Sequence, residues 1–128
     1  MSRSKGARKP CDRIVARQRL VDALQFLEAA ELLDAPDVVA TCAIHAAVAA
    51  ADANTCLALG ERSSDGNHLS AVELLRSVDA ALAAALQRAL DRKTQAACAS
   101  TDISKNDAAG CVKWARRLVV AAQTRLET

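Results

Sequence analysis

The amino-acid sequence predicts an all-α protein that folds as a single five-helix antiparallel bundle. Only four glycines and two prolines occur in 128 residues, and much of the apolar content is alanine, the strongest helix former. Apolar residues recur at spacings of three and four over five segments, and no segment alternates with the strength expected of a strand. A chain of this length suits one domain with one core.

Residues 1–10 are polar and basic, and they contain a glycine and a proline. We therefore expect a basic flexible tail, followed by a helical bundle over residues 11–128. Residues 1–19 carry a net charge of +6, whereas the remainder carries −4. This tail has two interpretations: a nucleic-acid contact through its cations, or a solubilising extension. The candidate nucleic-acid or nucleotide contacts in it are Arg3, Lys5, Arg8 and Lys9.

The first two expected helices cover residues 13–33 and 36–59. In the first, Leu20, Val21, Leu24 and Leu27 follow the helical repeat. Pro36 then marks a new start, because proline is favoured in the first turn of a helix. From residue 38 to 51 the second helix is apolar almost all round, so it should lie centrally in the bundle.

A loop over residues 60–67 precedes three further expected helices, at 68–77, 79–99 and 105–126. Asn67, Ser77 and Ser104 are expected to cap them, because a short polar side chain can accept from the free amides of a first turn. The last helix has the clearest apolar stripe, formed by Ala108, Val112, Ala115, Val119, Ala122 and Leu126. Apolar surface left on so small a bundle favours a homodimer.

The five cysteines form an odd set with no Cys-x-x-Cys pair, which favours free thiols in a reducing, cytoplasmic setting. Cys42 and His45 could share a helix face, but Cys56 lies about 21 Å further along the axis, so we expect no metal site. No cofactor motif occurs either. The longest uncharged run is too short to span a membrane, and charges interrupt any signal peptide, so neither is expected.

The order of four short motifs resembles the HEPN superfamily, in its small prokaryotic branch found beside nucleotidyltransferases. The matches, which span roughly residues 13–122, are Ile44-His45-Ala46-Ala47; Asn67-His68-Leu69 with Val72 to Leu75; Arg92, Ala96 and Cys98; and Ser104, Asp107, Ala108, Ala115, Leu118 and Val119. Family aromatics are replaced by Ala40, Thr41 and Cys98, which indicates a divergent member or one whose ancestral site has decayed. The resemblance implies a prokaryotic toxin–antitoxin, nucleotidyltransferase-associated or defence role, with a nucleotidyltransferase or antitoxin as partner.

Many HEPN proteins are metal-independent RNases with an Arg-x(4–6)-His motif, in which arginine binds phosphate and histidine assists proton transfer. Arg92 occupies the position resembling this arginine, but no histidine follows it. Lys93 and Gln95 extend a polar cluster there, so we expect it to bind nucleotide, RNA or a partner at a dimer cleft without catalysing cleavage. The alternative for these residues is an ordinary solvated helix end.

One literal match to the motif, from Arg62 to His68, lies in another loop, and chance is the simpler explanation for it. His68 should mainly help to open its helix, and His45 should be a hydrogen-bonded core residue. The sequence therefore favours a non-catalytic, dimerising or partner- and nucleotide-binding HEPN-like protein. The alternatives are a metal-independent HEPN RNase that uses Arg92, or Arg62 with His68, and a nucleic-acid-binding protein that uses its basic arm.

Overall fold

The computed structural model describes residues 7–64, 66–99 and 103–128, with the backbone alone for 93–99. Its helices are α1 (Arg13–Leu32), α2 (Pro36–Leu59), α3 (His68–Arg76), α4 (Ala80–Ala99) and α5 (Lys105–Glu127). The predicted all-α bundle is confirmed, and each helix boundary lies within one residue of its predicted position. The helices form where apolar periodicity and capping residues coincide, and both signals are local.

Side-chain caps fix most of the helix starts. Asp12, Asn67 and Ser104 each accept a backbone amide hydrogen bond at the beginning of α1, α3 and α5. Asp79 accepts from the amides of Ala81 and Leu82 at the beginning of α4. The predicted cap at Ser77 is wrong, because its hydroxyl donates to the Leu74 carbonyl at the end of α3 instead. The carboxylate two residues later is closer to the first turn of α4 and takes its amides.

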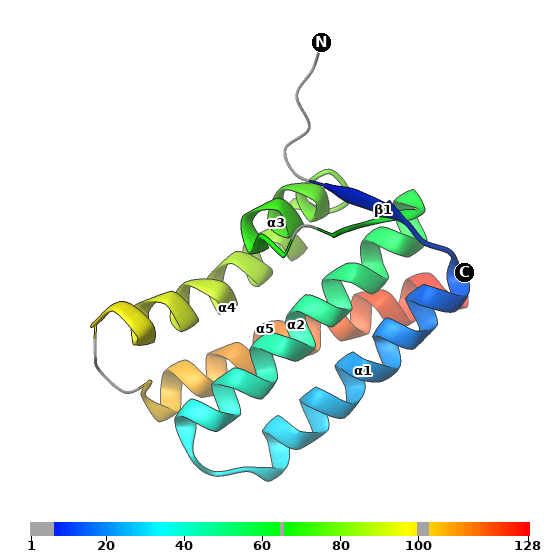
Figure 1. The fold of residues 1–128 in the computed structure, drawn as a ribbon. Helices are drawn as coiled ribbons and strands as arrows, with labels where there is room; N and C mark the ends of the chain where they lie inside the picture. Colours follow the sequence, from blue (N-terminus) through cyan, green and yellow to red (C-terminus); the bar gives the residue numbers. More distant parts are fainter. Residues whose placement is uncertain (1–6, 65, 100–102) are drawn as a thin grey trace.

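Helix α2 occupies the centre of the bundle, with α1 and α5 alongside it and α3 and α4 completing the structure (Figure 1). Most of its residues are buried, including an alanine-rich run from Ala46 to Ala53 broken only by Val48 and Asp52. Alanine allows close approach of the helix axes. Among the described residues, α2 is the one helix long and apolar enough to cross a membrane, and 67% of that window is buried inside the protein, as in a core helix.

Polar contacts within the bundle fix α5 against α2. Asn54 is fully buried, and its amide donates to the carbonyls of Ala50 and Leu118 at 2.9 and 3.1 Å. Its oxygen accepts from Arg125 Nε at 3.1 Å. Both the nitrogen and the oxygen of this buried amide therefore have partners, as burial of a polar side chain requires.

A short antiparallel ribbon lies beside the end of α2. Its strands are β1 (Arg8–Pro10) and β2 (Glu61–Ser63), and Lys9 pairs with Arg62 in the register. The expectation of a flexible tail over residues 1–10 is therefore wrong for residues 8–10, whose backbone pairs with a strand that follows α2. Arg3 and Lys5 lie outside the described residues.

Candidate anion-binding pocket

A cavity of about 280 Å³ lies where the end of α2, β2 and the start of α3 meet. It is lined by Val48, Asp52, Arg62, Ser63, Ser64, Gly66, Asn67, His68 and Ala71. Two of the candidate site residues, Arg62 and His68, therefore line the same cavity, although their spacing alone was more simply explained by chance. We call this feature the Arg62–His68 pocket.

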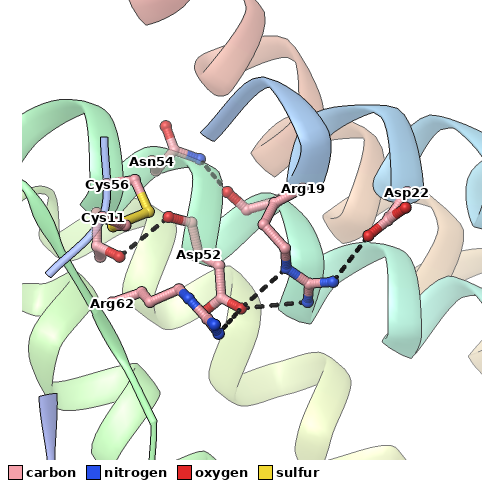
Figure 2. A network of polar contacts seen from close by, with 9 residues as sticks. Cys11, Arg19, Asp22, Asp52, Asn54, Cys56 and Arg62 are labelled. Atoms are coloured by element: carbon pink, nitrogen blue, oxygen red, sulfur yellow. Dashed lines mark hydrogen bonds and ion pairs between the residues drawn. A yellow bond between two sulfur atoms is a disulfide. The ribbon is translucent and has the colours of Figure 1, made fainter. Parts of the chain in front are cut away.

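Asp52 is the shared acceptor of the polar network around the pocket. It is the one carboxylate within the apolar part of α2, and it is only 7% exposed. Arg19 of α1 donates from Nε to Asp52 Oδ2 at 3.2 Å, and Arg62 Nη1 lies 3.9 Å from the same oxygen. Figure 2 shows the two arginines reaching this carboxylate from two sides. A second ion pair joins Arg19 to Asp22 at 3.0 Å.

Burial raises the pKa of Asp52 above its ordinary value, and the charges of Arg19 and Arg62 offset only part of this effect. A smaller contribution from His68 also lowers the pKa of Asp52. A buried carboxylate requires cationic partners, because an isolated charge in an apolar interior is strongly unfavourable. Asp52 thus explains why two arginines from different segments converge here.

Arg62 is the cation of the pocket with hydrogen-bonding capacity to spare. Its Nε is buried and has no hydrogen-bond acceptor within the described part of the chain. Its ion pair with Asp52, at 3.9 Å, is longer than an ordinary hydrogen bond. An unsatisfied buried donor of this kind calls for an explanation.

The loop between β2 and α3 shapes the other wall. Gly66 adopts a positive φ of 73°, a conformation that glycine reaches without steric cost. Asn67 caps α3 by accepting from the Leu69 amide at 2.9 Å. This cap fixes the start of the helix, so that His68, its first residue, lines the pocket. A guanidinium and an imidazole beside one cavity can bind an anion and transfer a proton.

The disulfide Cys11–Cys56 lies close to the network (Figure 2). It joins the residue after β1 to the last turn of α2, with a Cα–Cα distance of 5.5 Å. The expectation that every cysteine is a free thiol is therefore wrong for this pair, because folding brings together two cysteines 45 residues apart. Among the described cysteines, Cys42 and Cys111 are free, and burial raises the pKa of Cys111 to about 11.

Arg92 lies away from the pocket lining, between α4 and α5. Its Nε is 3.7 Å from Asp107, in the first turn of α5. The ion pair joins the C-terminal half of α4 to the first turn of α5, which favours a structural role for Arg92. Lys93 and Gln95 belong to α4, but their side chains lie outside the described residues.

His45 differs from the predicted core histidine, because it is exposed on α2 and stacks on Phe26 with ring centroids 5.1 Å apart. Phe26 belongs to α1, so the two rings cover part of the boundary between α1 and α2 from outside.

In the described ranges no group of three His, Cys, Asp or Glu residues could hold a metal ion.

Asp52 and Arg19 are site residues that the sequence interpretation missed. The signal for Asp52 was available, because a carboxylate inside an otherwise apolar helix must find cationic partners. No pattern of spacing identified Arg19 or Arg62 as those partners, since they come from a different helix and from strand β2.

Comparison with protein-family models, with curated proteins and with solved structures found no match. The class that fold and site define is a small helical bundle with a polar pocket lined by arginine and histidine. The HEPN relationship stays an expectation from the sequence.

Proposed function

We propose that the protein recognises RNA by binding a phosphate group in the Arg62–His68 pocket. One observation carries the proposal: Arg62 of β2 and His68 at the start of α3, with five residues between them, line the same cavity beside the buried Asp52. Asp52 restrains the arginine through one contact at 3.9 Å, and other N–H groups of the guanidinium can donate to a phosphate oxygen. A cavity of about 280 Å³ is close to the lower end of small-molecule sites and suits one nucleotide unit.

The polymer, rather than a free nucleotide, is proposed because a second cation lies outside the pocket. Lys9 pairs directly with Arg62 across the ribbon and is exposed. A second positive charge beside the pocket can neutralise the adjacent phosphate of a chain. Serine hydroxyls at positions 63 and 64 add neutral hydrogen-bonding groups to the lining.

The test is the affinity of the purified protein for a short single-stranded RNA, measured by fluorescence anisotropy. Arg62→Ala should weaken binding about tenfold or more, because a hydrogen bond to a charged group contributes about 1.5–3 kcal/mol. Arg117→Ala is the matched control, since Arg117 is exposed on α5 and lies outside the pocket lining. Equal affinities for the two variants would refute the site, and preference for DNA of the same sequence would refute the choice of RNA.

The position of His68 in the pocket favours a second candidate function, cleavage of the bound RNA. In such a reaction an imidazole removes the proton of a 2′-hydroxyl, the 2′-oxygen attacks phosphorus, and the 5′-oxygen leaves with a proton from solvent. Arg62 would neutralise the charge that develops on the phosphate. Cleavage by the wild type that His68→Ala abolishes would establish this activity. Abolition by Arg92→Ala alone would move the site to the end of α4.

On the HEPN resemblance, we propose that the bundle acts in the cytoplasm as a homodimer, or with a nucleotidyltransferase or antitoxin, in a prokaryotic toxin–antitoxin, nucleotidyltransferase-associated or defence system. Large apolar side chains exposed on α1, such as Ile14 and Leu32, support an interface. Light scattering coupled to size-exclusion chromatography tests the homodimer. A mass of 13.5 kDa, that of one chain, at micromolar concentration would contradict it.

A further inference from the structure

The segment that precedes α1 is held against the pocket wall by a small number of hydrogen bonds. Its strand pairs three residues with β2, and the amide of Cys11 donates to the Gly60 carbonyl at 2.9 Å. At the other end of the ribbon, the Ser64 amide donates to the Ala7 carbonyl at 3.0 Å. An isolated two-stranded ribbon is marginally stable in water, so its hydrogen bonds alone do not hold it.

The ion pair across this ribbon is also weak. Arg8 and Glu61 lie 3.7 Å apart, with both side chains more than 40% exposed. Exposed ion pairs contribute little to stability, because water and salt screen them. The Cys11–Cys56 disulfide is therefore the strong connection between this segment and the bundle.

The strand held in this way places a positive charge, that of Lys9, beside the pocket. Lys9 is directly opposite Arg62 in the antiparallel register. Residues paired in this way project to the same face of a ribbon, with Cβ atoms about 5 Å apart. Arg62 lines the pocket, so an exposed lysine lies next to the pocket's guanidinium. Two cations at this spacing suit an anion with several oxygens, or two adjacent phosphates of one strand.

We propose that the Cys11–Cys56 disulfide is a redox-sensitive latch that sets the affinity of the pocket for RNA. This inference rests on the proposed function and adds its regulation. With the disulfide closed, β1 stays on β2 and Lys9 stays beside Arg62. With the disulfide open, β1 leaves, whereas Arg62 keeps its place between Gly60 and the α3 cap.

The opening reaction is exchange with a dithiol. A thiolate of the dithiol attacks the sulfur of Cys11, the more exposed of the two cysteines, and Cys56 leaves as a thiolate that takes up a proton. The second thiol of the reagent then attacks the mixed disulfide and releases Cys11 as a thiol. The protein disulfide gains two electrons and two protons, and the dithiol becomes a cyclic disulfide. In a cytoplasmic protein such a disulfide is typical of redox sensing.

The experiment compares RNA affinity of the full chain before and after treatment with dithiothreitol. Reduction should weaken binding several-fold, and the slope of log affinity against log salt should fall by about 0.7 for each phosphate that the protein no longer neutralises. The Cys11→Ser/Cys56→Ser variant should match the reduced protein and ignore the reagent. Lys9→Ala should bind in the oxidised state as weakly as the reduced wild type, whereas Cys42→Ser should behave as the wild type. Equal affinity of the oxidised and reduced wild type would overturn the proposal.

Hydrogen exchange separates failure of the latch from failure of the proposed function. Reduction should speed exchange of the Cys11 and Ser64 amides, which bond across the ribbon, without changing the Asn54 region of α2. A protein that binds no RNA in either state but shows this change has a latch and lacks the proposed function. Unchanged exchange at Cys11 and Ser64 refutes the latch. Disappearance of the helical circular dichroism signal on reduction also refutes it, because the disulfide would then support the whole fold.

Discussion

Replacement of Val119 by aspartate is a direct test of how the bundle is packed. Val119 is 2% exposed on α5, in the core that this helix shares with α2. Burial of a valine side chain contributes about 1.5–3 kcal/mol, and the variant lacks this contribution. The new carboxyl must then take up a proton in the core. A carboxyl pKa raised by about 3 units costs about 4 kcal/mol at neutral pH.

The sum, about 5–7 kcal/mol, is comparable with the whole stability of a small domain. Val119→Asp should therefore be largely unfolded, or melt at least about 20 °C lower, in thermal denaturation followed by circular dichroism. Lys113→Asp is the control, because Lys113 is exposed on the same helix and should change stability by about 0.5 kcal/mol or less. Equal melting temperatures for the two variants would show that the buried face of α5 is assigned wrongly.

Three further predictions concern the cysteines and the buried carboxylate. Because burial raises the pKa of Cys111 to about 11, iodoacetamide at pH 8 should modify Cys42 well before Cys111, and peptide mass spectrometry would reveal the reverse order if the burial is wrong. The Cys11→Ser/Cys56→Ser variant should lose about 4 kcal/mol for a loop closed between residues 45 apart, and should melt about 10–15 °C lower; an unchanged midpoint would exclude the disulfide from the folded protein. Burial raises the pKa of Asp52 from 3.8, so the folded state binds the carboxyl proton of Asp52 more tightly than the unfolded state does. The wild type should therefore lose stability relative to Asp52→Asn as pH rises from about 4 through the raised pKa. Urea denaturation across this range would contradict the prediction if the stability gap stayed constant or changed in the opposite direction.

Part of the site could be predicted from the sequence, and part depended on contacts between distant residues. Arg62 and His68 were named as a pair by their spacing, but spacing alone does not show that the two side chains share a cavity. Arg92 had the stronger family likeness, yet its described ion pair is with Asp107 of the next helix. The distinction comes from the packing of α4 against α5, which a linear motif does not contain.

The number, order and boundaries of the helices were determined by the sequence itself. Apolar residues three and four apart, a proline at the start of α2, and caps such as Asn67 and Ser104 act within a single turn. These signals are local, so they can be read before the chain is folded. The absence of a strong strand pattern likewise predicted an all-α protein.

Only the tertiary structure decided which distant groups meet. The Cys11–Cys56 disulfide, the strand at residues 8–10, and the ion pair of Arg19 with Asp52 each join segments more than 30 residues apart. His45 is exposed and stacks on Phe26 of α1, although its sequence neighbours are apolar. Such contacts depend on how helices pack around α2, because a residue's partners across the core are set by geometry in space and not by its position along the chain.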